Sequence, residues 1–195
     1  MSKKPTRKRP YEQKLRAEQA AETRQRIVEA ALHLHGTIGP ARTTVSMIAE
    51  RAGVQRHTYY AHFPDDRGLF CACSGLLQER DPMPDAESWH GIADPKTRLV
   101  KGLGALYDWY GRNAELVAAI LRDAEHHPVT AETVAHRVTP HLDRMAAVLS
   151  DGIPTRQRHL LHLALSFHTW RSLVQESGLS PKTAITTMTR AIFGE

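Results

Sequence analysis

Apolar residues recur along most of the chain at the spacing of amphipathic α-helices. The first such pattern begins near residue 19, repeats with a period of about 3.6 residues, and ends at Gly39 and Pro40. Further helices are expected over residues 44–53, 55–62, 64–79, 96–112, 114–126, 130–150, 155–177 and 181–193. No run of alternating β-branched residues is long enough to predict a strand. The pattern therefore predicts an all-α fold of about nine helices.

The second and third expected helices are short and lie close together in the sequence. Either Thr43 or Thr44 can cap the second helix, and Gly53 suits the position that follows its last residue. Two short helices joined by a turn of three to four residues containing Gly form a helix-turn-helix. The first three helices are therefore expected to form a helix-turn-helix unit.

The expected third helix has two faces of different chemistry. Tyr59 and Phe63 are four residues apart and are predicted to point inward, whereas Tyr60 points outward. The outward set has no acidic member and consists of Gln55, Arg56, His57, Thr58, Tyr60 and His62. These side chains suit DNA, where Arg and Gln read base edges and hydroxyls bind phosphates. The alternative is a solvated amphipathic helix that happens to lack acids.

The positive charge of the chain is concentrated in its first third. Residues 1–67 contain 13 Lys and Arg against 7 Asp and Glu, a net charge of +6, whereas the whole chain carries +5. This asymmetry favours a polyanionic partner for the first third, although a solubilising tail is the alternative. We expect residues 1–18 to be a disordered basic arm, residues 19–67 the helix-turn-helix domain, and residues 68–195 a second helical domain.

The apolar runs are too short to cross a membrane, and the basic N-terminus lacks the apolar core of a secretory signal. We therefore expect a cytoplasmic protein with no membrane partner. The sequence also lacks the nucleophile-elbow, Walker A and dinucleotide-binding signatures, so an enzyme is not expected. Although His159 and His162 are one helical turn apart, no further ligand pattern supports a metal site, and we predict neither a metal nor a cofactor.

Residues 23–70 resemble the DNA-binding domain of the TetR/AcrR family of bacterial transcriptional regulators. The family pattern is matched without a gap at Ile27, Ala30, Ala31, Leu34, Gly39, Thr43, Thr44, Val45, Ile48, Ala49, Ala52, Gly53, Val54, Thr58, Tyr60, His62 and Phe63. The resemblance implies that the third helix is the recognition helix, with Arg56 and His57 nearest the base edges. It places Thr44, Thr58, Tyr60 and His62 nearest the phosphates.

The chain departs from the family pattern at two positions. His35 replaces a Phe in the first helix, which alters a core contact. Asp66 replaces a Lys that contacts phosphate in the family, and we expect Arg67 to substitute for it. Basic residues of the N-terminal arm, including Lys8 and Arg9, are expected to compensate further by reaching phosphates or a minor groove.

For residues 68–195 the resemblance implies a helical ligand-binding and dimerisation domain. Candidates for lining the ligand pocket are Leu103, Tyr107, Trp109 and Tyr110. At most two of the three aromatic residues can face one pocket, because consecutive helical residues diverge by about 100°. An ordinary core role is the alternative for each of them.

The same resemblance implies that the last two helices, over residues 155–177 and 181–193, would pair with their copies in a second subunit. The residues expected at this dimer interface are Leu161, Leu165, Trp170 and Leu173. Burial within the same subunit is the alternative. The function expected is that of a ligand-responsive repressor, which binds a palindromic double-stranded DNA operator as a homodimer and answers an unknown small-molecule inducer. A DNA-binding regulator or architectural protein without an inducer is the alternative.

Overall fold

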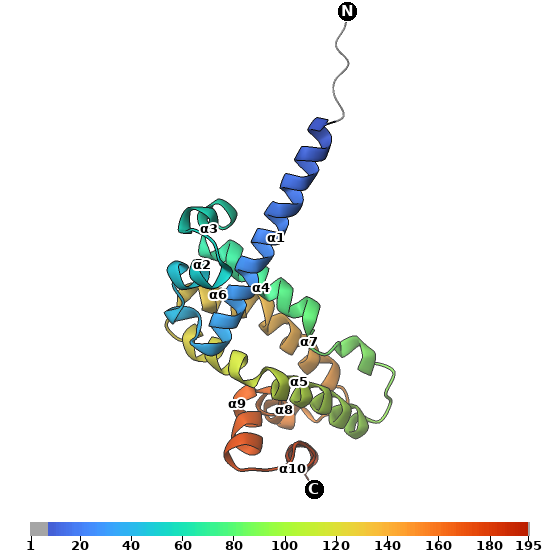
Figure 1. Cartoon of the computed structure of the whole chain (residues 1–195). Coiled ribbons are helices and arrows are strands. Elements are labelled where there is room, and N and C mark those ends of the chain that lie inside the picture. Colours follow the sequence, from blue (N-terminus) through green and yellow to red (C-terminus); the bar gives the residue numbers. More distant parts are fainter. Residues whose placement is uncertain (1–7, 195) are drawn as a thin grey trace, which may run out of the picture.

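The fold is helical throughout the described part of the chain. The computed structural model describes residues 8–194, with side chains from Tyr11 onward, and every regular element in this range is a helix or helical turn. The expected all-α fold is confirmed. The helix-turn-helix elements lie at one end of the molecule and α10 at the other (Figure 1). The long helices are α1 (Lys8–Thr37), α4 (Asp66–Arg80), α5 (Pro95–Ala124) and α10 (Pro181–Phe193).

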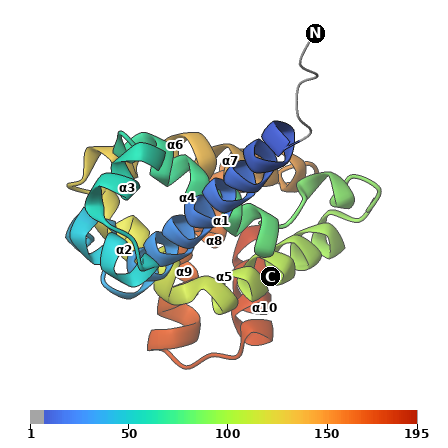
Figure 2. The same ribbon diagram turned by 45° about the horizontal axis from the view of Figure 1, so that its top comes forward.

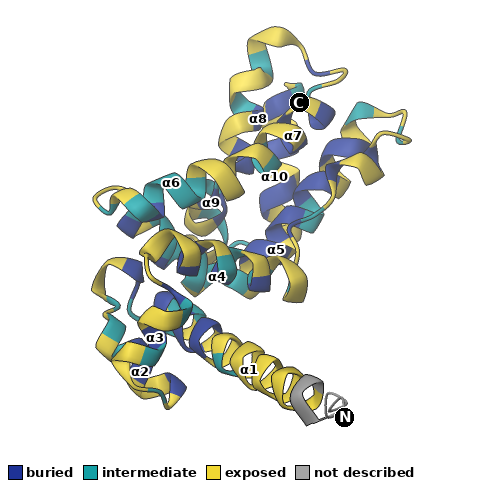
Figure 3. Ribbon diagram, turned by 90° about the horizontal axis from the view of Figure 1, so that it is seen from above, coloured by how far each residue is buried: buried dark blue, intermediate teal, exposed yellow. Residues whose placement is uncertain are grey.

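The first helix begins earlier than its apolar pattern predicts. The expectation of a disordered arm over residues 1–18 is wrong from Lys8 onward, because α1 starts there; residues 1–7 lie outside the described part. Ala, Glu, Gln, Lys and Arg dominate the early turns and favour helix without burial. Pro10 stands in the first turn, where a missing amide hydrogen costs little. Residues 11–22 are consequently exposed along a projecting half-helix (Figure 3).

Local capping residues fix the short helices α2 (Val45–Ala52) and α3 (Arg56–His62). The Thr44 hydroxyl oxygen accepts a hydrogen bond from the Met47 amide at 3.3 Å, so Thr44 is the N-cap of α2. Gly53 ends α2 with φ 64°, a left-handed conformation that favours glycine. Both residues act as their sequence positions predict.

One apolar cluster holds the helix-turn-helix together. Ile27 of α1, Ile48 of α2 and Tyr59 of α3 are buried in it. The helices α2 and α3 lie beside the C-terminal half of α1 (Figure 2). The cluster also includes Leu69 and Leu76 of α4. The domain boundary expected after residue 67 therefore falls inside a helix that completes the N-terminal core.

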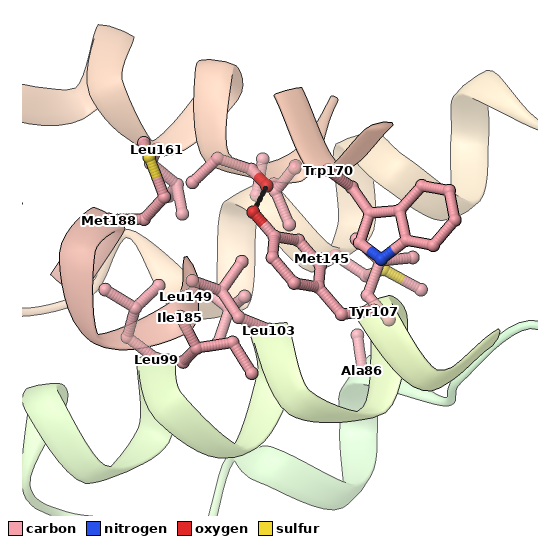
Figure 4. Packing of buried hydrophobic residues seen from close by; sticks show 14 of the residues in the cluster. Ala86, Leu99, Leu103, Tyr107, Met145, Leu149, Leu161, Trp170, Ile185 and Met188 are labelled. Atoms are coloured by element: carbon pink, nitrogen blue, oxygen red, sulfur yellow. Dashed lines mark hydrogen bonds between the residues drawn. The ribbon is translucent and has the colours of Figure 1, made fainter. Parts of the chain in front are cut away.

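A second and larger cluster surrounds α5. Leu99, Leu103 and Tyr107 of α5 meet Met145 and other side chains of α7 (Thr139–Leu149), α8 (Arg158–Leu165) and α10 (Figure 4). A short 3-10 turn, η2 (Ala86–Trp89), buries Ala86 and Trp89 against this core, between the helices predicted over residues 64–79 and 96–112.

The helices predicted in the second domain are interrupted at several points. The two helices predicted on either side of Asn113 are joined in α5 across a kink at Asn113, which alone has non-helical angles, so the predicted break is confirmed. The helix predicted over residues 130–150 is two helices, α6 (Pro128–Arg137) and α7, with Val138 between them. Pro140 explains this break, because proline cannot donate to the preceding turn and restricts the residue before it.

The helix predicted over residues 155–177 is also divided. It comprises the turn η3 (Thr155–Gln157), α8, α9 (Phe167–Trp170) and a π-helical turn, η4 (Arg171–Glu176). Ser166 is extended between α8 and α9. The hydroxyls of Tyr107 and Tyr110 donate to the carbonyls of Ala164 and Leu165 at 3.1 and 2.7 Å. Two buried tyrosines from α5 thus satisfy acceptors that the end of α8 leaves open.

A buried carboxylate joins the two parts of the molecule. Asp123, near the end of α5, accepts a hydrogen bond from the Ala41 amide at 2.8 Å in the turn η1 (Pro40–Arg42) and pairs with Arg122. Burial acts to raise the pKa of Asp123, but the bonds from Arg122 and the Ala41 amide outweigh it and leave the pKa below its ordinary value. Gly39 precedes the turn with φ 96°, and a Cβ there would meet Asp123 and Arg122.

Candidate nucleic-acid interface and internal cavity

The two adjacent tyrosines of α3 face opposite ways, as the sequence predicts. Tyr59 is 1% exposed and packs with Phe63, whereas Tyr60 is 46% exposed. The guanidinium of Arg24, from α1, lies 4.8 Å from the centre of the Phe63 ring. The inward face therefore holds α3 firmly against the core and leaves the other face free.

The outward face of α3 is polar and without a carboxylate. Gln55, Arg56, His57 and Tyr60 are exposed, while Thr58 and His62 are half-buried at its edge. This face and the projecting end of α1 lie at the end of the molecule away from α10 (Figures 1 and 3). A single helix of this chemistry fits the width of a DNA major groove.

The residues around α3 complete this surface. Thr44 caps α2 through its oxygen and is exposed, so its hydroxyl hydrogen remains able to donate to an anion. Lys8 and Arg9 belong to the first turn of α1, and the positions of their side chains lie outside what the structure describes.

Arg67, expected to replace the usual basic residue at position 66, has an acidic neighbour. Its guanidinium lies 2.9 Å from the Glu132 carboxylate of α6, although the side chain of Arg67 remains largely exposed. Asp65 caps α4 by accepting from the Gly68 amide at 2.8 Å, and Asp66 stands in the first turn. Carboxylates are favourable at a helix N-terminus, which explains their presence beside an otherwise basic surface.

His35 occupies the core position where the family pattern has Phe. It is 5% exposed, and its ring centre lies 4.9 Å from that of Phe70. Burial, with a smaller contribution from His127, lowers the pKa of His35 to about 4. Near neutral pH the ring is therefore uncharged and packs as an aromatic residue.

The second domain contains a mostly apolar cavity of about 360 Å³. Helices α4 to α9 contribute to its walls, including Leu77 of α4, Val138 between α6 and α7, and Phe167 of α9. This volume lies within the range of small-molecule sites, about 300–1,000 Å³. The sequence did not indicate Leu77, Phe167 or the polar residues Asp143 and His168, because three separate helices bring them together.

Two of the four residues expected to line a pocket do so. Trp109 and Tyr110 face the cavity. Leu103 and Tyr107 instead lie fully inside the core around α5, where they meet α7, α8 and α10 (Figure 4), so their assignment to the cavity wall is corrected. Because α5 is covered on several sides, burial alone could not tell which of its faces borders the cavity.

The expected dimer residues are placed mainly inside the chain itself. Leu161, Leu165 and Trp170 are at most 3% exposed and belong to the core of the same subunit, so they offer no surface to a partner. Leu173 is half-buried against that core. The outer face of α8 instead presents Leu163, which is 51% exposed.

Among the described residues, no group of three His, Cys, Asp or Glu side chains is arranged to hold a metal ion. His159 and His162 are exposed on α8. Likewise, no helix in residues 8–194 is long and apolar enough to cross a membrane.

Comparison with known proteins agrees with this architecture. Residues 27–73 match the family model of bacterial regulatory proteins of the tetR family. The chain is 31% identical over 155 residues to the HTH-type transcriptional repressor KstR of Mycolicibacterium smegmatis, covering 78% of this chain and 74% of that one. It is 40% identical over 79 residues to the HTH-type transcriptional regulator TtgR of Pseudomonas putida, covering 40% and 38%.

Solved structures share the fold. Salmonella enterica GusR superposes with a TM-score of 0.60 at 21% identity, covering 89% of this chain and 96% of that chain. A TetR transcription regulator from Haloarcula marismortui superposes with a TM-score of 0.59 at 17% identity, covering 89% and 98%. A capped helix-turn-helix on a helical second domain defines the class of helix-turn-helix transcriptional regulators. Within that class, the chain belongs to the TetR family.

Proposed function

We propose that this regulator is a ligand-responsive repressor, which binds a palindromic operator as a homodimer and releases it when a small molecule occupies the cavity. The observation that carries the proposal is the divided α3, whose inward Tyr59 is buried while Arg56, His57 and Tyr60 stand exposed without an acidic neighbour on the helix. A family that regulates transcription supports the same function.

In this proposal each outward residue has a distinct contact. Gln55, Arg56 and His57 stand at the start of α3 and read base edges, since the N-terminal residues of a recognition helix enter the major groove. Phosphates are bound by Thr44, Thr58, Tyr60 and His62, with Arg67, Lys8 and Arg9 adding positive charge outside the groove.

Adjacent residues of α4 connect the cavity to the DNA-binding end. Leu76 is buried in the helix-turn-helix core, and Leu77 lines the cavity. A ligand that displaces Leu77 would therefore move a helix on which α3 depends. Ligand binding would favour a spacing of the two recognition helices that no longer matches the operator.

The dimer is proposed to form through the exposed faces of α8 and α10 rather than through the residues buried beneath them. Ile185, Met188 and Ile192 turn one face of α10 toward α5, so the opposite face remains accessible. Leu163 offers an apolar side chain on the neighbouring α8 surface.

Fluorescence anisotropy with DNA from the region upstream of the chain's own gene tests the proposal. We expect binding that weakens steeply with salt and that Arg56→Ala reduces by about tenfold or more, since a base-reading contact contributes roughly 1–3 kcal/mol. Glu50→Gln, an exposed change on α2 that removes no donor, is the control. Equal binding to unrelated DNA at all salt concentrations would refute the proposed function.

A further inference from the structure

The cavity combines apolar walls with a single formal charge. Among the described residues that line it, Asp143 of α7 is the one Asp or Glu, and neither Lys nor Arg contributes. The Asp143 side chain is exposed, so it stands at the open edge of the cavity and keeps its hydration until a ligand arrives. An exposed carboxylate avoids the desolvation cost that a buried one would carry.

Several other polar atoms of the wall form hydrogen bonds within the protein, and the imidazoles of His162 and His168 also border the cavity. The Tyr110 hydroxyl donates to the Leu165 carbonyl at 2.7 Å, and Trp109 Nε1 donates to the Asp81 carbonyl at 2.9 Å. Ser166 Oγ accepts from the His168 amide at 3.2 Å. The aromatic residues thus present ring surface to a ligand rather than hydrogen-bonding groups.

This chemistry distinguishes between ligand charges. A carboxylate or phosphate in the cavity would find no Lys or Arg, only the imidazoles of His162 and His168, and would be repelled by Asp143. A protonated amine would be attracted by Asp143, and the rings of Trp109, Tyr110 and Phe167 are surfaces against which a cation also binds favourably. The apolar remainder of a ligand would fill the space between the aliphatic side chains.

We propose that the cavity binds lipophilic cations, molecules with an aromatic or alkyl body and one amine or quaternary ammonium group, and that Asp143 selects their charge. This assignment rests on the proposed function, because it names the chemical class of the ligand to which the repressor responds. It concerns the binding step alone, so it can be tested without DNA.

Isothermal titration calorimetry of the full chain with phenylhexylamine, phenylhexanol and phenylhexanoate compares three charges on one body. We expect the amine to bind about tenfold more tightly than the carboxylate, because attraction and repulsion by one partly exposed carboxylate act in opposite directions on the two probes. The alcohol should fall between them. A carboxylate or alcohol that binds as tightly as the amine would overturn the proposal, as would no binding of any probe.

Two substitutions of Asp143 test whether this side chain causes the preference for the amine over the carboxylate. Asp143→Asn should bring the affinities for amine and carboxylate to within about twofold, and Asp143→Glu should restore most of the difference. Asp108→Asn removes an exposed carboxylate of α5 outside the cavity wall and should leave the preference intact. A preference that survives in Asp143→Asn, with the fold verified by thermal unfolding, would contradict the role of Asp143.

A separate measurement distinguishes this inference from the proposed function. If the amine binds as expected but does not release operator DNA, the cavity assignment stands and the ligand response fails. If the chain binds and releases its operator but prefers the carboxylate, the proposed function stands and the ligand class is wrong.

Discussion

The two apolar clusters of this protein have different structural roles. The N-terminal cluster is small, and it holds α3 so that Tyr59 and Phe63 are buried while the other face is free. The cluster around α5 is larger, yet the same domain leaves a cavity of about 360 Å³ beside it. The first region fixes a surface in place, whereas the second encloses space that another molecule can fill.

The two regions also treat buried tyrosine differently. Tyr107 and Tyr110 each donate a hydrogen bond to a carbonyl at the end of α8. Within the described part of the chain, the buried hydroxyl of Tyr59 has no hydrogen-bond partner. Tyr59 therefore stabilises the helix-turn-helix through the packing of its ring, whereas Tyr107 and Tyr110 stabilise the second domain through both their rings and their hydroxyls.

Removing the Tyr59 ring should give the largest effect. We expect Tyr59→Ala to lower the free energy of unfolding by about 3–5 kcal/mol, the usual cost of deleting a buried aromatic side chain. Chemical denaturation followed by circular dichroism measures this loss. Tyr60→Ala is the matched control and should leave stability within about 0.5 kcal/mol while it weakens DNA binding. An unchanged melting temperature in Tyr59→Ala would show that the inward face is assigned wrongly.

Acid should weaken the N-terminal region through His35. Its folded-state pKa of about 4 lies below its ordinary value of 6.5, so the unfolded chain binds the proton more tightly. The stability linked to neutral His35 is fully present above pH 6.5 and is lost as the pH falls toward 4, by on the order of 3 kcal/mol.

His35→Phe should remove this pH dependence and restore the side chain of the family pattern. His33→Gln, at an exposed position of the same helix, should leave it unchanged. Unfolding measured at intervals between pH 7 and pH 4 makes the comparison. The same acid sensitivity in His35→Phe would assign it to other groups.

Removing one tyrosine hydroxyl from each cluster should change stability by different amounts. Tyr110→Phe should destabilise the protein by about 1–3 kcal/mol, because the buried Leu165 carbonyl loses its donor. Tyr59→Phe removes an unpaired hydroxyl and should be neutral or slightly stabilising. Equal losses in the two variants, measured by urea denaturation, would contradict the difference between the clusters.

The smallest expected effect concerns the ion pair that links the regions near the DNA-binding end. Glu132→Gln should free Arg67 and strengthen operator binding by up to about fivefold, since exposed ion pairs contribute up to about 1 kcal/mol. Arg67→Gln should weaken binding. Anisotropy titrations at low salt measure both changes, and stronger binding in Arg67→Gln would exclude its proposed phosphate contact.

The helix-turn-helix was predictable because its signals are local. Thr44 caps α2, Gly53 adopts a left-handed angle, and the alternation of Tyr59 and Tyr60 follows from helical periodicity. The start of α1 at Lys8 was missed, because an apolar pattern detects buried helix and this half-helix is exposed.

The second domain was predictable only as a set of helices. Leu161, Leu165 and Trp170 form a broad apolar surface in the sequence, which suits either a partner subunit or the core of the same chain. Helical periodicity indicates that one face of a helix is buried, but it does not indicate whether that face packs inside the same chain or against a partner subunit. The break at Ser166 was likewise hidden, because it depends on tyrosines from α5 that satisfy the open carbonyls.

The sequence by itself thus determined the helical class, the position of the helix-turn-helix and the two faces of α3. These features depend on residues within one or two turns of each other. Tertiary structure alone decided which face of α5 borders the cavity, which leucines remain inside the subunit, and how Asp143 comes to line the same cavity as Trp109 and Phe167. Each of these depends on the packing of helices distant in sequence, where several arrangements bury the same apolar residues and only their combined shapes select one.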